Sequence, residues 1–569
     1  MVLATKTRSD RFIMLTRYKK YMEMHVYDFY ALIIIALAAL LRISLLYLGW
    51  PPTNSDEGTM GIMALHIAHG QDYPVFFYGQ NYMGSLEAYL GASLFYLIGP
   101  SLFALRLGLV CLFSLFLLTL YFLTKLLYTK KYALASIILL SFGSTEMLTR
   151  ELKALGGVVE TMLFGTLILL ITSWLVLPSL LTSHRSRVVA YGLLGLVMGL
   201  GIWSHMLVVP FVCVSFVLLF LFCRAERRTR TTISLVLGLL IGLFPLLLYN
   251  VEYPLQNSLV TIWQLHRLGG GPELIPFTFW DQIVGSVLLS LPMATSAPYL
   301  CPVSADIGEW RSQISSCMVA QGLWGAGFLV LGFAASFLFL QELRSVYASY
   351  KVSEALDEKR SVVLCTLRLM VLGSAGLTLL AYVLSPAPAL FPTTSARYLV
   401  GLLVALPTIL TPLWRHISTI ASAPSRRTVL ITIIRYSLFA LIGCMLAAGT
   451  LSAFQQTSAV QAQNQQRKLL IADLLRLHAT RIYSDYWTCD DIIFQTNERI
   501  ICSVIDENFQ SGSDRYVPYY SIVQHDPHAA YVFHANSPQA SFMRKVPDAS
   551  KFHIIPIASG YLLFERTTT

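Results

Sequence analysis

The sequence predicts a polytopic α-helical membrane protein of about eleven spans that ends in a small α/β domain outside the membrane. Three observations support this fold class. The 569 residues are 55% hydrophobic and only 13% charged, whereas a soluble protein carries about 25% charged residues. Apolar runs of about 17–23 residues recur along the chain, and a helix needs roughly 20 to cross a bilayer. Beyond residue 454 these runs give way to short helix-like and strand-like segments.

The N-terminal tail, residues 1–28, is predicted to be cytoplasmic because basic residues favour the inner side of a membrane. Its basic residues are Arg8, Arg11, Arg17, Lys19 and Lys20. The apolar stretch behind the tail is long enough to span and lacks a small-residue cleavage site, so we interpret it as a retained first span. The transmembrane region, 29–454, then contains predicted spans at 29–48, 104–126, 132–148, 158–177, 188–206, 207–223, 231–249, 319–341, 362–384, 398–414 and 430–451.

Basic residues gather in the loops that this scheme places inside. These loops hold Lys125, Lys130, Lys131, Arg185, Arg187, Arg224, Arg227, Arg228, Arg230, Arg344, Lys351, Lys359, Arg360, Arg415, Arg426 and Arg427. The short outer loops hold only Arg150, Lys153, Arg267, Arg311 and Arg397. This asymmetry predicts a multi-pass plasma-membrane protein with a cytoplasmic N-terminus and an extracytoplasmic C-terminal domain.

Two apolar segments are too short to count as spans. Residues 84–98 lie in the predicted outer loop 49–103, and counting them as a span would invert the charge asymmetry of every later loop. We therefore interpret 84–98 as a juxtamembrane or re-entrant helix on the outer side. The segment 279–296 is interpreted in the same way.

Residues 455–569 are predicted to form the extracytoplasmic domain. Residues 461–478 have the periodicity of an amphipathic helix. A helical stretch at Asp490–Gln495 lies among strand-like runs at Arg481–Asp485, Ile500–Ile505, Ala530–His534, Phe552–Ile557 and Tyr561–Phe564. This alternation predicts Rossmann-like layering. No glycine-rich turn follows a strand, so dinucleotide binding is not indicated.

Cysteine spacing argues against a zinc site, and the distribution of charge argues against a nucleic-acid partner. The outer segments permit the disulfides Cys301–Cys317 and Cys489–Cys502, whereas the other five cysteines lie in or beside spans. No spacing predicts a zinc site, no cofactor is indicated, and a requirement for a divalent metal is left open. The net charge of +10 reflects basic loops between spans, which argues against a nucleic-acid partner.

The acidic pair Asp56-Glu57 follows the first predicted span. No Lys or Arg occurs between Arg42 and Arg106 to neutralise it, and carboxylates beside a membrane are costly to keep without a function. The pair could also cap a helix that begins near residue 59. A carboxylate base with facing cations suits a reaction whose leaving group is a lipid-linked phosphate. The carboxylate deprotonates an acceptor hydroxyl while the cations hold the phosphate.

Further functional groups fall on the same predicted face. The candidate phosphate ligands are Lys153, Arg150, Arg397, His266 and Arg267. The candidate substrate ligands are Tyr78, Gln80, Asn81, Tyr82, Glu87, Tyr398 and His205. Structural roles remain alternatives: Glu87 as a polar group between helices, the basic residues as interfacial anchors or ion-pair partners, and the histidines as packing residues.

The acidic pair after the first span resembles the signature of GT-C glycosyltransferases. More narrowly, it is similar to the bacterial branch of protein O-mannosyltransferases and aminoarabinose transferases. Three other stretches are similar to motifs of that branch: Tyr78–Tyr89, Lys153–Gly157 with Glu160-Thr161, and Arg397-Tyr398. In addition, Tyr483–Ile500 is similar to periplasmic domains appended to such enzymes. The resemblance covers nearly the whole chain, although each motif is short.

The resemblance implies an inverting sugar transfer from a polyprenyl-phosphate donor to an acceptor hydroxyl at the outer face of the plasma membrane. Asp56 is the implied general base, and Glu57 is expected to support it or to cap a helix. The implied partners are the lipid-linked sugar, an acceptor protein, glycan or lipid, and the bilayer. Gln80-Asn81-Tyr82 stands where family members often have Pro-Pro-Leu or Lys, so the identity of the phosphate-binding cation is left open.

Two other functions are compatible with a polytopic chain. A transporter or lipid flippase requires ionisable residues near mid-bilayer and paired interrupted helices from internal repeats. The sequence shows no such repeat, and Arg42 is the one charged residue inside the first span. A surface receptor with an outer ligand-binding domain does not account for the polar residues on the outer face of the membrane region.

Overall fold

The computed structural model describes residues 26–178, 180–181, 183–224, 229–256, 258, 260–261, 263–264, 276–303, 307–353, 355–414, 426–545 and 552–566. Within these residues, eight helices are long and apolar enough to cross a membrane. They are Val26–Tyr47, α4 (Leu102–Leu127), α7 (Val158–Val176), α8 (His184–Ser204), α10 (Thr229–Glu252), α14 (Ser316–Ser353), α15 (Leu356–Val383) and α19 (Arg426–Arg476). The chain is therefore a multi-pass membrane protein, as its composition predicts.

Three predicted spans are broken or short. The predicted span 132–148 is divided into α5 (Lys130–Ser141) and α6 (Thr145–Leu152), which meet at 89° because Ser144 caps a new helix. The segment 207–223 becomes η1 (Met206–Val208) and α9 (Val209–Phe222). The segment 398–414 is divided among η6 (Thr394–Leu399), α17 (Leu402–Ile409) and α18 (Thr411–Trp414). Proline at positions 407 and 412 removes helical N–H donors there.

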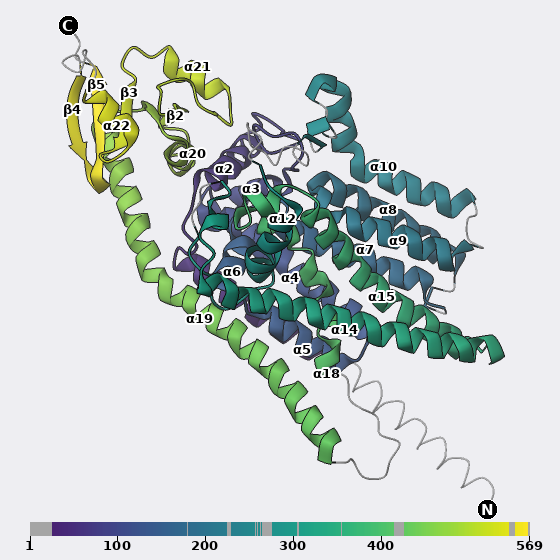
Figure 1. The fold of residues 1–569 in the computed structure, drawn as a ribbon. Coiled ribbons are helices and arrows are strands. Elements are labelled where there is room, and N and C mark those ends of the chain that lie inside the picture. The colour runs from purple at the N-terminus through teal and green to yellow at the C-terminus, as the bar shows by residue number, and fades with distance from the viewer. Residues whose placement is uncertain are drawn as a thin grey trace, which may run out of the picture.

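Short helices gather at the end of the bundle that carries the C-terminal domain (Figure 1). They are α2 (Ser55–Ala68), α3 (Leu86–Ile98), α12 (Phe279–Gly285), the π-helical turn η4 (Ser286–Ser290), α13 (Leu291–Ala294) and α16 (Ala387–Leu390). The segments 84–98 and 279–296, predicted to be short outer helices, thus correspond to α3 and to α12 through α13. Helix α3 packs between α2 and α4.

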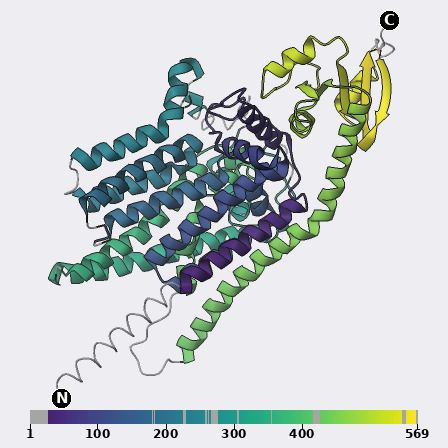
Figure 2. The same cartoon turned by 180° about the vertical axis from the view of Figure 1, so that it is seen from behind.

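Helix α19 connects the membrane region to the C-terminal domain. The sequence predicts a span at 430–451 and a separate helix at 461–478, but residues 452–460 contain neither Pro nor Gly, and the helix continues through them. At 1.5 Å per residue it is about 75 Å long. Figure 2 shows the first helix alongside α19, where Leu45, Leu46 and Trp50 share a buried cluster with Ala453 and Val460.

The C-terminal domain is a five-stranded sheet in the order β2-β1-β3-β5-β4. Strands β1 (Arg481–Ser484), β2 (Ile501–Val504) and β3 (Ala530–His534) are parallel, whereas β4 (Phe552–Ile557) and β5 (Tyr561–Arg566) add an antiparallel edge. Helices α20 (Tyr486–Gln495), α21 (Pro518–Gln524) and α22 (Pro538–Met543) lie between strands. The predicted helix–strand alternation is confirmed, and both permitted disulfides, Cys301–Cys317 and Cys489–Cys502, are formed.

Close packing of α20 on α2 docks this domain onto the membrane region. A Cβ atom at Gly58 would lie 2.5 Å from the backbone carbon of Asp490, and one at Gly61 would lie 2.5 Å from the Phe494 ring. Only glycine therefore permits this helix separation. Ser55 Oγ also donates to the Tyr486 carbonyl at 2.5 Å. The first turn of α2, which contains the acidic pair, is thus held against the first turn of α20.

Candidate active site

Helix α2 places the two carboxylates of the acidic pair in its first turn. Asn54 caps the helix, and its side chain accepts a hydrogen bond from the Glu57 N–H. Adjacent residues on a helix point in directions about 100° apart, so Asp56 and Glu57 reach different surroundings. The two carboxylates can therefore have different functions.

Glu57 is completely buried and has an ion-pair partner, although the sequence suggested none. Arg106 of α4 binds both of its oxygens, with Nε–Oε1 at 2.7 Å and Nη2–Oε2 at 2.6 Å. The Ala154 N–H donates to Oε1 at 3.2 Å. Burial favours the protonated form, but Arg106 and Lys153 outweigh it and lower the pKa of Glu57. Glu57 thus ties α2 to α4 and to the loop after α6.

Asp56 remains partly open, with its side chain 27% exposed. Its Oδ1 atom accepts a hydrogen bond from the Tyr486 hydroxyl and lies 3.3 Å from Arg515 Nη2. Both partners belong to the C-terminal domain. Arg515 Nε in turn donates to the Tyr486 oxygen at 2.9 Å. The membrane region and the C-terminal domain therefore meet at this carboxylate.

Two cations, Lys153 and Arg397, lie near Asp56. Within the described part of the chain, neither cation has a carboxylate at ion-pair distance. Lys153 follows α6 and is half-buried. Arg397 lies in η6 with its guanidinium carbon 5.4 Å from the Tyr398 ring centre. Arg150 differs, because Glu146 pairs with it at 2.8 Å and the Thr393 carbonyl accepts from it at 3.1 Å. His266 and Arg267 lie outside the described residues.

A small pocket is lined by four of the predicted site residues, Tyr82, His205, Arg397 and Tyr398. Gly156 and Gly157 form another wall and have positive φ angles, +79° and +82°. A Cβ on Gly157 would lie 2.3 Å from the His205 ring, so this glycine admits the histidine. Burial raises the pKa of Tyr82 to about 12, which keeps its hydroxyl a hydrogen-bond donor at neutral pH.

The remaining predicted ligands do not line this pocket. The Tyr78 hydroxyl binds Asp72 at 2.7 Å and His66 at 2.8 Å. Asn81 donates to the Gln256 carbonyl at 2.6 Å. Glu87 is buried and accepts from the Gly156 N–H at 3.0 Å, while Gln80 Oε1 is buried without a partner among the described residues. These four contribute to packing of the outer loop in this arrangement.

Sequence reasoning missed Arg515 and identified Tyr486 only as part of a longer motif. Both lie more than 400 residues from Asp56 in the chain, and no periodicity connects positions so far apart. Asp490 lies in the same motif as Tyr486 and accepts from Thr59 at 2.5 Å. In the described ranges, no three His, Cys, Asp or Glu side chains are grouped as ligands for a metal ion.

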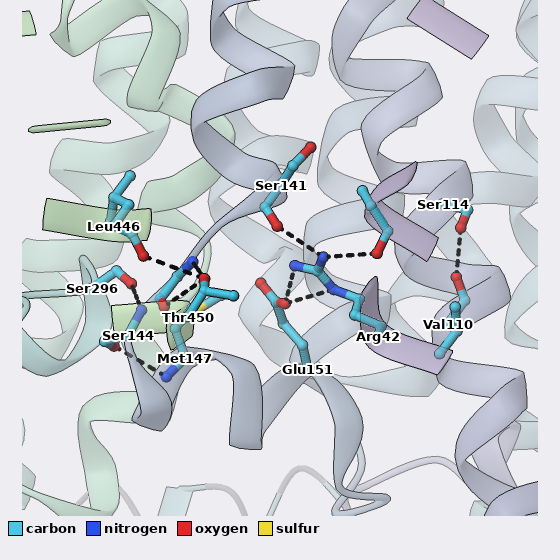
Figure 3. Close-up of polar contacts among 12 residues, drawn as sticks. Arg42, Val110, Ser114, Ser141, Ser144, Met147, Glu151, Ser296, Leu446 and Thr450 are labelled. Carbon is cyan, nitrogen blue, oxygen red and sulfur yellow. Dashed lines mark hydrogen bonds and ion pairs between the residues drawn. The ribbon is translucent and has the colours of Figure 1, made fainter. Parts of the chain in front are cut away.

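Arg42, the charged residue in the first span, is paired inside the protein. It lies 2.5 Å from Glu151 Oε2 through Nη2 and donates to the carbonyls of Ala38 and Ser141 (Figure 3). Glu151 also borders an apolar cavity of about 400 Å³ that is lined mainly by α14, α17, α18 and α19. Ser296, which accepts from the Ser144 N–H at 2.6 Å, lies on the same wall.

Comparison with solved structures identifies the fold. ArnT from Cupriavidus metallidurans bound to undecaprenyl phosphate aligns over 95% of this chain and 98% of its own, with a TM-score of 0.55 and 11% identity. The archaeal oligosaccharyltransferase AglB from Archaeoglobus fulgidus, in complex with an inhibitory peptide and a dolichol-phosphate, covers 95% of this chain and 74% of its own. Its TM-score is 0.47 at 13% identity, so the fold assignment rests on ArnT.

Sequence comparison adds no relative to this result. No protein-family model matches the chain, and no curated protein matches it. The structural alignment nevertheless extends through the membrane region and the C-terminal domain alike. The chain is a multi-pass membrane protein whose fold is similar to that of ArnT, which agrees with the fold class predicted from the sequence.

Proposed function

We propose that this protein is a membrane glycosyltransferase that moves a sugar from a polyprenyl-phosphate donor to an acceptor hydroxyl on the outer face of the plasma membrane. One observation carries the proposal. A partly exposed carboxylate, Asp56, lies beside Lys153 and Arg397, which lack a carboxylate partner among the described residues. A base next to cations that have no carboxylate at ion-pair distance is the arrangement that transfer from a phosphate leaving group requires. The shared fold with ArnT supports it.

In the proposed reaction, Asp56 takes the proton of the acceptor hydroxyl. The acceptor oxygen bonds to the anomeric carbon from the face opposite the phosphate, the bond from that carbon to the phosphate oxygen breaks, and the configuration inverts. The phosphate leaves with the electron pair, and Lys153 and Arg397 stabilise its negative charge. Arg150 is already paired with Glu146, so we assign it to positioning of η6 through the Thr393 carbonyl.

The apolar cavity is the proposed site for the donor's hydrocarbon chain. Its lining is almost entirely Leu, Ile, Val, Met, Phe and Trp side chains, and such surfaces bind lipid through apolar contact. Glu151 borders this cavity and lies two residues before Lys153 in the chain. In this proposal the donor's phosphate lies at the Glu151 end of the cavity, toward Lys153.

The first test is sugar transfer by purified protein in lipid nanodiscs from a panel of synthetic polyprenyl-phosphate sugars. Asp56→Asn is expected to lower the transfer rate by about 10²–10⁴-fold, the usual contribution of a general base. The matched control is Asp526→Asn, which makes the same change in a C-terminal turn that an asparagine also supports. Full activity of Asp56→Asn would exclude it as the base. Absence of transfer from every donor, together with lipid or ion transport, would favour a transporter.

A further inference from the structure

The C-terminal domain contacts the proposed base through one oxygen only. Oδ1 of Asp56 binds the Tyr486 hydroxyl and Arg515 Nη2. Oδ2 accepts no hydrogen bond from any residue that the structure describes. The two oxygens of this carboxylate are therefore not equivalent.

We propose that Arg515 and Tyr486 are positioning residues of the C-terminal domain, which hold Oδ1 of Asp56 so that Oδ2 receives the acceptor's proton. This inference rests on the proposed glycosyl transfer. In that step the acceptor O–H proton goes to Oδ2, the acceptor oxygen forms the new glycosidic bond, and the phosphate departs with the electrons of the broken bond. Arg515 and Tyr486 keep their own protons throughout.

Arg515 is held rigidly enough for this task. Its guanidinium carbon lies 5.4 Å from the ring centres of both Phe77 and Tyr486. Its side chain is 19% exposed. Gly79 has a positive φ of +71°, and a Cβ there would lie 3.2 Å from Arg515 Cδ, so the outer loop closes directly onto the arginine stem. Contacts from both the outer loop and α20 thus fix the direction of the guanidinium.

Tyr486 is positioned by the same contacts that dock the domain. It is the first residue of α20, and its carbonyl accepts from Ser55 Oγ at 2.5 Å. The Asp490 N–H donates to Ser55 Oγ at 3.2 Å. Because Ser55 precedes Asp56 in the chain, these bonds fix the tyrosine hydroxyl relative to the carboxylate. A shift of about 1 Å in a reacting group can cost 10²-fold in rate.

The inference is tested with Tyr486→Phe and Arg515→Gln, assayed for transfer in nanodiscs. Each variant is expected to lower kcat by about 10–100-fold with little change in the KM of either substrate. Arg515→Lys keeps the charge but not the planar fork and should recover activity only in part. The control is Thr59→Val, which removes the hydrogen bond to Asp490 at the same interface without touching Asp56.

Comparison with the control separates positioning from a merely structural role. Thr59→Val weakens the same interface, so a merely structural role predicts an equal loss of kcat in Thr59→Val and in Arg515→Gln. A positioning role predicts that Arg515→Gln loses more kcat than Thr59→Val does, with little change in KM.

The outcomes distinguish this inference from the proposed function. The positioning role is wrong if Tyr486→Phe and Arg515→Gln both keep the wild-type kcat while Asp56→Asn is inactive. That result would leave the proposed glycosyltransferase function standing. An equal loss of kcat in Thr59→Val also overturns the positioning role. In the Asp56→Asn background, Arg515→Gln should cause no further loss if the arginine acts through the base. Full activity of Asp56→Asn removes Asp56 as the base and this inference with it, whereas absence of transfer from every donor removes the proposed function.

Discussion

Two neighbouring carboxylates in the first turn of α2 have opposite surroundings. Glu57 is enclosed and bound on both oxygens by Arg106, whereas Asp56 is partly exposed and bound on one oxygen. A group that must meet a substrate has to keep a free face, and a buried bidentate ion pair keeps none. This contrast assigns the chemistry to Asp56 and a structural role to Glu57 within the proposed function.

Glu57→Gln is predicted to destabilise the protein without acting on the chemical step. It leaves Arg106 buried without its counter-charge, which costs about 3–5 kcal/mol when one partner of a buried pair is removed. Thermal unfolding of the purified variant should show a clear fall in Tm, whereas Asp56→Asn should unfold close to the wild type. The double variant Glu57→Gln with Arg106→Met should recover part of the loss. A stable Glu57→Gln protein with a collapsed kcat would contradict this assignment.

At the scale of elements, the α2–α20 contact joins the two parts of the chain. Burial raises the pKa of Asp490 to about 7, above its ordinary 3.8. A carboxyl whose pKa is raised by folding stabilises the folded state fully below the unfolded value, and this contribution is lost as pH rises through about 7. At 1.36 kcal/mol per pKa unit the effect is on the order of 4 kcal/mol. We therefore predict that wild-type Tm falls between pH 4 and pH 8.

Asp490→Asn isolates that contribution from other titrating groups. The amide oxygen still accepts from Thr59 Oγ1, which reaches the carboxyl at 2.5 Å, but it carries no charge to desolvate. The Tm difference between variant and wild type should therefore grow in favour of the variant as pH rises from 4 to 8. Parallel Tm curves over that range would show that Asp490 does not titrate at this interface.

Helix bounds could be predicted from the sequence where apolar composition determines them. They were harder to predict where a single local contact determines them. Apolar length predicts α4 and α7 to within two residues at each end, because burial in lipid requires roughly 20 apolar residues. The break between α5 and α6 depends on the Ser144 cap, which a hydropathy window does not resolve. The continuity of α19 depends on the lack of any helix breaker between a span and a polar helix.

For the whole molecule, the site is assembled from segments that are distant in sequence. Asp56, Lys153 and Arg397 were identified individually from their place on one predicted face. The residues that bind Oδ1 of Asp56 lie 430 and 459 residues away in the chain. They reach it only because the C-terminal domain docks on the membrane region. The candidate reacting groups can therefore be predicted from the sequence, whereas the groups that orient them cannot.

The charge pattern also predicts the orientation of the whole molecule. Asp56 contacts Arg515 of the C-terminal domain, so the proposed site lies at the end of the bundle that bears this domain (Figure 1), and the basic loops are predicted on the other side. A peptide tag on the C-terminus should therefore react with a membrane-impermeant probe on intact cells. The same tag on the N-terminus should react only after permeabilisation. Equal labelling of both tags on intact cells would contradict an odd number of membrane passes, and the reverse pattern would place the proposed transfer on the cytoplasmic face.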